Sequence, residues 1–302
     1  MMDRKTDKSL LELSRKYKEA KRVPHRSGWL YKIGRGIRRV FKGNFGSVFR
    51  EVQHRFSVSG HFTTKGNMDW EEPSPRLDAT GLRIAVYSCI TGHYDLVTEP
   101  LYTEPELDYY LFTDMEVSFY SKWKKIDITA WKEYTELSPV QLNRKIKMLP
   151  FRYLPEYDYS IYVDGNIEII APMSPLVEEM GSCAFGVHYH RTRDCICDEL
   201  DQIIHLMKAD PALAGRQVLA YMNEGFPRHY GLYENPVLVR KHGDEGVCRL
   251  MEDWWQEYLR YPTRDQLSLP YIIWKTGYDR KNIHILGKNF SENPRFNKTR
   301  SH

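Results

Sequence analysis

Short apolar runs alternate with amphipathic stretches along most of this chain. The apolar runs are rich in β-branched and aromatic residues, which predicts buried strands over residues 82–88, 109–112, 159–163, 184–187 and 236–239. Helices are predicted near residues 141–151, 195–208, 211–223, 244–260 and 264–275. Strands that alternate with helices predict an α/β fold with a mostly parallel central sheet flanked by helices.

The amino-terminal part of the chain has a different character. Residues 1–55 are strongly basic and predict a helical arm, in which residues 28–55 interleave aromatic and cationic side chains. That combination favours contact with an anionic membrane surface. A helical pair docked on the rest of the protein and a dimer contact are the alternatives. The arm has no recognised nucleic-acid-binding motif, so no nucleic-acid partner is expected.

Residues 56–80 contain several glycines and prolines with little periodicity, which predicts a linker before a folded domain over residues 81–302. Apolar residues make up 41% and charged residues 28% of the chain, as in globular proteins. There is no uninterrupted apolar run of transmembrane length and no signal-like start. The five cysteines are an odd number, so free thiols in a reducing compartment are expected. These features predict a cytoplasmic protein, with peripheral contact at the inner membrane face through the arm.

Polar side chains follow the first three predicted strands. In open α/β sheets, ligands bind beyond the carboxyl ends of the strands, so these side chains predict one site across that edge of the sheet. They are Ser88, Thr91, Gly92 and Asp95 at the end of the first strand, Thr113 and Asp114 at the end of the second, and Asp164 and Asn166 at the end of the third.

The sequence Asp164-Gly165-Asn166 is the most informative of these strand ends. Carboxylate and amide oxygens two residues apart can hold a hard cation such as Mn²⁺ or Mg²⁺, which in turn neutralises a diphosphate. The alternative is an ordinary tight turn, because Asp-Gly and Gly-Asn both favour turns. The position directly after a buried strand favours the metal site.

The chain also resembles a known family. Arg144 and Lys147 on a helix, followed by Val163-Asp164-Gly165-Asn166, are similar to motifs of the glycosyltransferase-like domain family once called DUF616 and now named after the plant TOD1 and MUCI70 proteins. Further similar motifs, in the same order, are His188 with Arg193-Asp194-Cys195, Gly231-Leu232-Tyr233-Glu234, and Arg264-Asp265-Gln266-Leu267-Ser268. The resemblance covers roughly residues 82–302 and implies the nucleotide-diphospho-sugar transferase (GT-A) fold.

The resemblance implies a metal-dependent transferase that moves a sugar from a nucleoside-diphosphate sugar to a glycan or lipid-linked acceptor, in surface polysaccharide synthesis. It places Arg144, Lys147, His188 and Arg193 in the donor site, beside the strand-end residues. Asp265 and Gln266 are expected near the donor sugar or the acceptor, with Asp265 as the catalytic base or as a helix N-terminal carboxylate, and Glu234 as the rival base. Asp164, Asn166 and His284 are the expected metal ligands. Asn166 stands where the D-x-D motif of the GT-A fold has its second carboxylate, which weakens that metal site.

Two other functions are compatible with the sequence. A neutral Asn166 leaves room for a non-catalytic protein that binds sugar nucleotides or glycans. A link between a plant member of the family and ceramide cleavage suggests a lipid amide hydrolase, although the sequence has neither a Ser-His-Asp order nor an H-E-x-x-H helix in its support.

Overall fold

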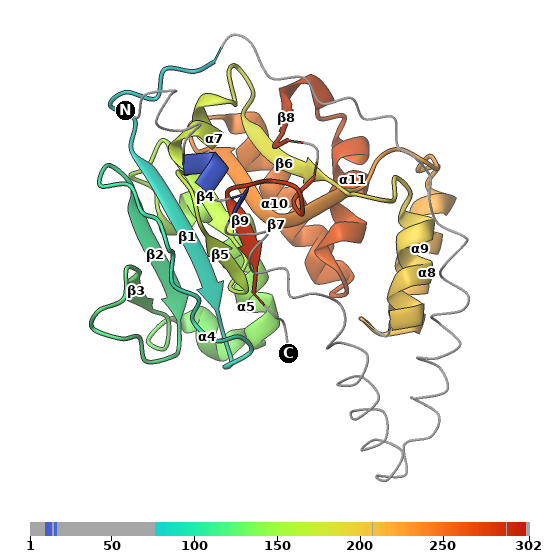
Figure 1. Cartoon of the computed structure of the whole chain (residues 1–302). Helices are drawn as coiled ribbons and strands as arrows, with labels where there is room; N and C mark the ends of the chain where they lie inside the picture. The colour runs from blue at the N-terminus through green and yellow to red at the C-terminus, as the bar shows by residue number, and fades with distance from the viewer. Residues whose placement is uncertain (1–9, 14, 17–75, 207, 288, 300–302) are drawn as a thin grey trace, which may run out of the picture.

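The computed structural model describes residues 10–13, 15–16, 76–206, 208–287 and 289–299 (Figure 1). Most of the predicted basic arm and linker therefore lies outside the described residues, apart from a short helical stretch at residues 10–13 and 15–16 and the segment 76–80. No helix in the described ranges has the length and apolar character needed to cross a bilayer.

A seven-stranded sheet with the order β3-β2-β1-β4-β7-β6-β8 forms the centre of the molecule. Neighbouring strands from β3 to β4 are parallel, as are β6 and β8, whereas β7 is antiparallel to both of its neighbours. The sheet is therefore mostly parallel and flanked by helices, which confirms the predicted fold class. The strands are β1 (Ile84–Ile90), β2 (Asp108–Thr113), β3 (Lys124–Asp127), β4 (Tyr159–Val163), β6 (Phe185–Tyr189), β7 (Tyr233–Lys241) and β8 (Ile283–Ile285).

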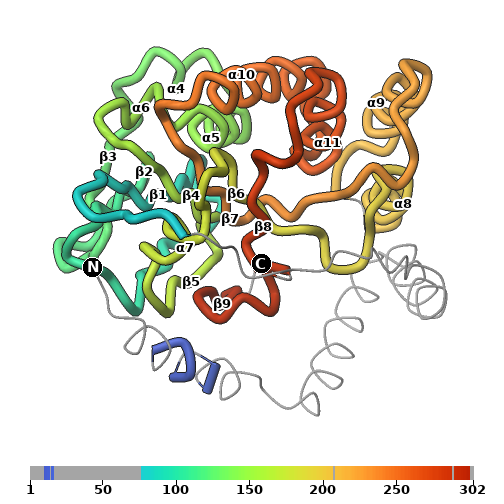
Figure 2. The backbone as a smooth tube through the Cα atoms, turned by 90° about the horizontal axis from the view of Figure 1, so that it is seen from above, coloured from blue at the N-terminus to red at the C-terminus, as the bar shows by residue number. Residues whose placement is uncertain are grey.

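Side chains on the two faces of the sheet enter two separate cores, because successive residues of a strand point to opposite faces. On β1, Ala85 and Tyr87 pack in one core, whereas Ile84 and Val86 pack in the other. The first core is covered mainly by α5 (Pro139–Met148), α10 (Glu245–Arg260) and α11 (Asp265–Thr276), with α8 (Ile196–Leu206) and α9 (Pro211–Asn223) beside them (Figure 2).

The opposite face of the sheet is covered by a small layer that the sequence did not predict. It consists of α7 (Ser174–Glu178) and a two-stranded ribbon of β5 (Ile167–Ile169) and β9 (Phe296–Lys298). The ribbon joins the segment directly after β4 to the carboxyl-terminal end of the described chain. This pairing brings the residues around Lys298 to the end of β4, across more than 130 positions of sequence.

Most of the predicted elements are confirmed, with small shifts at their ends. The predicted helix near residues 141–151 is instead two helices, α5 and the short α6 (Pro150–Tyr153), because Pro150 cannot donate the backbone hydrogen bond that a continuous helix requires. The strand predicted at residues 236–239 is longer and begins at Tyr233. The remaining elements are α4 (Lys132–Glu136) and the 3₁₀ turn Arg280–Asn282.

Candidate active site

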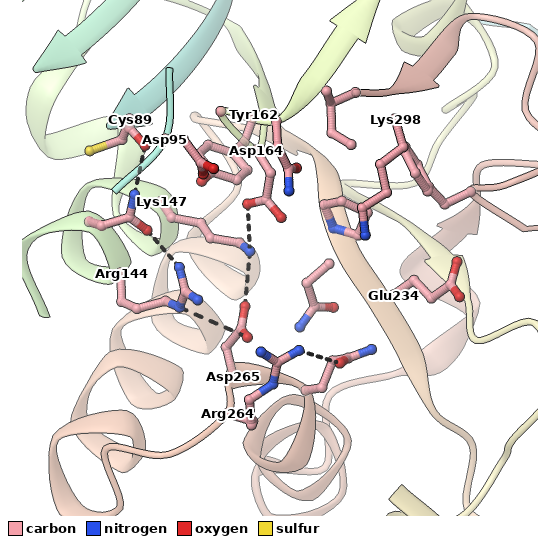
Figure 3. A pocket seen from close by; sticks show the side chains of 18 of the residues that line it. Cys89, Asp95, Arg144, Lys147, Tyr162, Asp164, Glu234, Arg264, Asp265 and Lys298 are labelled. Carbon is pink, nitrogen blue, oxygen red and sulfur yellow. Dashed lines mark hydrogen bonds and ion pairs between the residues drawn. The ribbon is translucent and has the colours of Figure 1, made fainter. Parts of the chain in front are cut away.

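A cavity of about 1050 Å³ opens at the carboxyl ends of β1 and β4. Because β7 runs antiparallel to β4, its first residues lie at the same edge of the sheet, and the backbone N–H of Asp164 donates to the carbonyl oxygen of Pro236 at 2.8 Å. The helices α5 and α11 form one side of the cavity, and the β5–β9 ribbon borders another side. Figure 3 shows side chains from these elements pointing toward a common space.

Most of the residues predicted from the sequence come together in this cavity. They are Thr91, Asp95, Arg144, Lys147, Asp164, Asn166, Arg193, Glu234, Asp265 and Gln266. They come from six separate parts of the chain, so the expectation of one convergent site at the strand ends agrees with the geometry.

Four of the predicted strand-end residues lie beside the cavity without lining it. Ser88 and Thr113 are buried within β1 and β2. The backbone N–H of Gly92 donates to Asp114 Oδ2 at 2.8 Å, so these two residues tie the ends of β1 and β2 together. Their geometry supports the loop that carries Thr91 and Asp95.

Two predicted histidines also lie outside the lining of the cavity. His188 is fully buried, with its ring edge-on to Phe290 and Phe296 and its Nε2 3.1 Å from Asn293 Nδ2. His284 lies on β8 with its Nε2 3.9 Å from Glu179 Oε2. The structure therefore does not bring His284 to Asp164 and Asn166, as a shared metal ion would require.

Asp164-Gly165-Asn166 forms a turn that leads from β4 to β5. The backbone N–H of Ile167 donates to the carbonyl oxygen of Asp164 at 3.0 Å and closes the turn. A β-carbon on Gly165 would lie 2.7 Å from Ile90 Cγ1, closer than atoms of this kind can pack. Glycine is therefore required here by the close approach of β1, and the turn exposes Asp164 and Asn166 to the cavity.

We expect Gly165→Ala to lower the free energy of unfolding by about 1–3 kcal/mol, because Ile90 must move to admit the methyl group. Gly215→Ala is the matched control, since Gly215 lies inside α9 with open space around its missing β-carbon. That change should stabilise the protein by up to about 1 kcal/mol. Urea unfolding of both variants makes the comparison, and equal stability of the two would contradict the packing argument.

The ammonium group of Lys147 lies between two carboxylates at the floor of the cavity (Figure 3). Its Nζ is 3.3 Å from Asp164 Oδ1 and 2.9 Å from Asp265 Oδ2, and it lies 5.0 Å from the centre of the Tyr162 ring. Only 2% of the lysine side chain is exposed, and 6% of the Asp265 side chain, but 34% of the Asp164 side chain faces solvent. The lysine is thus held from below by Asp265 and meets the open cavity beside Asp164.

Local structure explains how α5 presents this lysine. Ser138 caps the helix in a reciprocal hydrogen-bonded box with Gln141, and Pro139 occupies the first helical position. Asn143 Nδ2 donates to the carbonyl oxygen of Cys89 at 2.7 Å, which ties the helix to the end of β1. Leu142 and other apolar residues of α5 pack on the sheet, so the stripe that includes Lys147 faces the cavity.

The far end of α5 is fixed by a buried arginine from β7. Arg240 Nη1 donates to the carbonyl oxygen of Lys147 at 2.7 Å, and its Nη2 donates to the hydroxyl of Tyr87 at the same distance. That hydroxyl also donates to the carbonyl oxygen of Lys147 at 2.9 Å. Arg240 and Tyr87 therefore position the backbone of Lys147, a function that the sequence alone did not reveal.

Arg144 is a second cation in the cluster and is partly buried, with 23% of its side chain exposed. Its Nε lies 3.9 Å from Asp265 Oδ1, and its Nη1 donates to Asn143 Oδ1 at 2.6 Å. Burial alone would lower the pKa of Arg144, but Asp265 and Asp164 raise it above its ordinary value. Burial alone would likewise raise the pKa of Asp265, but Lys147, Arg144 and Arg264 lower it below the usual range of an aspartate. Asp265 is therefore ionised and forms ion pairs with two cations, Lys147 and Arg144.

Glu234 has a different environment, at the start of β7. Its Oε1 accepts a long hydrogen bond of 3.5 Å from the backbone N–H of Arg191, and its buried Oε2 has no hydrogen-bond partner in the protein. Burial raises the pKa of this carboxyl group above its ordinary value. A carboxylate with a raised pKa at the wall of a cavity is suited to accept a proton.

The structure also places polar residues in the cavity that the sequence did not predict. The buried side chain of Asn235, next to Glu234, has neither its amide oxygen nor its amide nitrogen hydrogen-bonded in the protein. His190 lines the cavity, where burial, Arg193 and Lys208 lower its pKa to about 3, so its ring is neutral near pH 7. The other additional lining residues with charged side chains are Glu199, Lys208, Arg264 and Lys298.

Different signals would have been needed to find these additional residues. Arg264 already stands in the motif Arg264–Ser268, and Asn235 directly follows Glu234, so an extension of that second motif by one position includes it. Lys208 and Lys298 reach the cavity only because of how α8 and the β5–β9 ribbon pack, which no local pattern encodes.

The predicted donor set for a divalent cation is incomplete in this geometry. Within the described ranges, no three residues among His, Cys, Asp and Glu are grouped as they would be around a metal ion. Asp164 already has a cationic partner in Lys147, and Asn166 supplies only a neutral amide. The predicted ligands Asp164, Asn166 and His284 therefore do not form the donor set of a resident divalent cation.

Comparisons with known proteins show what this chain is similar to. A family described as "TOD1/MUCI70, glycosyltransferase-like domain" matches residues 60–293. A probable hexosyltransferase of Arabidopsis thaliana, MUCI70, is 25% identical over 217 residues, which cover 63% of this chain and 37% of the plant protein. The chain thus spans little more than a third of that relative's length.

Two solved structures have a distant likeness to the fold. The bifunctional glycosyltransferase WbbM has 11% identity and a TM-score of 0.42, with 70% of this chain and 40% of that chain covered. Mouse xyloside xylosyltransferase 1 has 12% identity and a TM-score of 0.40, with 68% of this chain and 85% of that chain covered.

Proposed function

Because this chain belongs to the TOD1/MUCI70 glycosyltransferase-like domain family, we propose that it transfers a hexosyl group from a nucleoside-diphosphate sugar to a glycan or lipid-linked acceptor. The observation that carries this proposal is the pair of cations, the buried Lys147 and the partly buried Arg144, at the floor of a cavity beyond the strand ends. Cations that are fixed before the substrate arrives stabilise the negative charge of a leaving diphosphate at little cost in reorganisation.

In the proposed reaction, the oxygen of an acceptor hydroxyl bonds to the anomeric carbon of the donor sugar. The bond from that carbon to the diphosphate oxygen breaks, and the nucleoside diphosphate leaves with the electron pair. Lys147 and Arg144 stabilise the charge that develops on the diphosphate. Glu234 accepts the hydroxyl proton, because its raised pKa suits it better than Asp265, which is paired with cations.

Sugar recognition is proposed for Asn235 and Gln266. Asn235 offers an unused amide donor and acceptor inside the cavity, and such a group favours a ligand with hydroxyls over one without them. Gln266 Nε2 donates to the carbonyl oxygen of Tyr233 at 3.1 Å, which fixes its side chain close to Glu234.

The proposal is tested by measuring the thermal unfolding of the full chain with UDP, GDP and their sugars, with and without Mn²⁺, together with the release and transfer of sugar. We expect one nucleotide to raise the unfolding temperature and its sugar to be transferred or hydrolysed. Nucleotide binding without sugar release would favour the non-catalytic alternative. Cleavage of a lipid amide without any response to nucleotides would favour the hydrolase. No response to any nucleotide would overturn the proposal.

For the basic segment of residues 1–55, we propose peripheral contact with the anionic inner face of a membrane, as its interleaved cations and aromatics favour. The full chain should sediment with vesicles that contain anionic lipid and remain in solution with neutral vesicles. Raising the salt concentration should weaken the binding, because salt screens exposed charges. Equal binding to both vesicle types would contradict an electrostatic contact.

A further inference from the structure

We infer that the ammonium group of Lys147, held between Asp164 and Asp265, supplies the positive charge expected of a divalent cation, so that the donor diphosphate binds without metal. The inference rests on the proposed function, because it concerns how the same cavity holds the same substrate class.

The position of Lys147 Nζ is the first argument. A divalent cation at the end of β4 would bridge the carboxylate of Asp164 and the diphosphate. Lys147 Nζ already lies 3.3 Å from Asp164 Oδ1 and faces the cavity. A second cation close to it would be repelled by both Lys147 and Arg144.

The charges of the cluster are the second argument. The two carboxylates, Asp164 and Asp265, are matched by two cations, Lys147 and Arg144. An incoming metal ion would therefore find no uncompensated carboxylate among these four groups. Of the other two residues expected to bind metal, Asn166 is neutral, and His284 lies on β8 beside Glu179.

The unequal burial of the two carboxylates is the third argument. Asp265 is nearly inaccessible and makes the shorter contact with Lys147, whereas a third of the Asp164 side chain is exposed. Asp164 is thus the partner that a diphosphate oxygen can displace, while Asp265 keeps the lysine in place. A displaced Asp164 can then accept hydrogen bonds from hydroxyl groups of the donor.

Preorganisation is the fourth argument. The backbone carbonyl of Lys147 accepts hydrogen bonds from both Arg240 and Tyr87, and the Tyr162 ring lies next to its ammonium group. A lysine whose backbone and side chain are both fixed loses little conformational entropy when a ligand binds. Lys147 is therefore a rigid cation of the kind that diphosphate binding requires.

The test is calorimetric titration of the unmodified full chain with UDP and GDP, once in EDTA and once in Mn²⁺. We expect the dissociation constant of the preferred nucleotide to agree within about threefold between the two conditions. Binding that is at least tenfold tighter in Mn²⁺ would overturn the inference and leave the proposed function standing. Absence of binding in both conditions would overturn the proposed function as well.

Substitutions test whether Lys147 is the residue responsible for nucleotide binding without metal. Lys147→Met should weaken nucleotide binding in EDTA by about 10- to 100-fold, the usual loss for a charge-assisted contact, and Lys147→Arg should retain part of the affinity. Lys145→Met is the matched control, because Lys145 lies on the same helix but pairs with Glu133 at 3.2 Å and does not line the cavity. If Lys147→Met is folded and binds nucleotide as the unmodified chain does in EDTA, the inference is wrong.

Discussion

Replacing Glu234 with glutamine lowers the rate of sugar transfer by about 10²- to 10⁴-fold, the usual contribution of a positioned general base, and changes the affinity for the nucleoside diphosphate little. The reason is that glutamine keeps the shape of the side chain but cannot accept the proton of the acceptor hydroxyl. Steady-state kinetics with a saturating donor measure the loss, and calorimetry with the nucleotide measures the affinity.

The pH dependence gives this prediction a second readout. Burial raises the pKa of Glu234, and the carboxylate acts as a base only when it is deprotonated. Activity should therefore fall as the pH falls through a value above the ordinary range of a glutamate, and Glu234→Gln should lack that dependence.

Glu257→Gln is the control for this substitution, because Glu257 is also a buried carboxyl with a raised pKa but lies on α10 away from the cavity. The activity of the Glu257→Gln variant, and the decline of that activity as the pH falls, should match those of the unmodified protein. Retention of full activity by Glu234→Gln would remove Glu234 from the mechanism.

Replacing Asp265 with asparagine should lower the free energy of unfolding by about 3–5 kcal/mol, the usual cost of breaking a buried ion pair by removing one partner. Asp265 is 4% exposed, and its loss leaves Lys147 and Arg144 with only Asp164 as a carboxylate partner. Denaturant unfolding at neutral pH measures the change. Glu136→Gln, which breaks an exposed pair with Lys132, should cost less than about 1 kcal/mol.

The acid sensitivity of the fold should change in the same variant. The pKa of Asp265 is lower in the folded protein than in the unfolded chain, so its contribution to stability is complete above the unfolded value of about 3.9 and is lost as the pH falls below that value. Asp265→Asn removes this contribution. The free energy of unfolding should therefore decline less steeply with acid for the variant, and parallel declines for the two proteins would contradict the assigned pKa direction.

The strands and most helices could be predicted from the sequence because their signals are local. Tyr159–Val163 is a continuous apolar run, and Ser138 with Gln141 and Pro139 marks the start of α5. The convergence of Thr91 and Asp164 in one cavity was also predictable, because parallel strands place their carboxyl ends at the same edge of a sheet.

Other features depend on how segments distant in sequence pack together. β7 had a strand signal, but its antiparallel placement next to β4, which brings Glu234 and Asn235 to the cavity, has no local signature. The three-residue strands β5 and β9 are too short for a periodic pattern and form through their mutual pairing.

The largest difference between the prediction from sequence and the structure concerns the charged side chains at the end of β4. The sequence by itself determined that a carboxylate, Asp164, follows a buried strand, and that Arg144 and Lys147 share one helix face, because composition and spacing fix both. Only the tertiary structure decided that Lys147 and Asp164 are partners of each other and share Asp265. The physical reason is that an ion pair depends on distance in space, and the residues of this cluster meet only when α5, β4 and α11 pack around the same edge of the sheet.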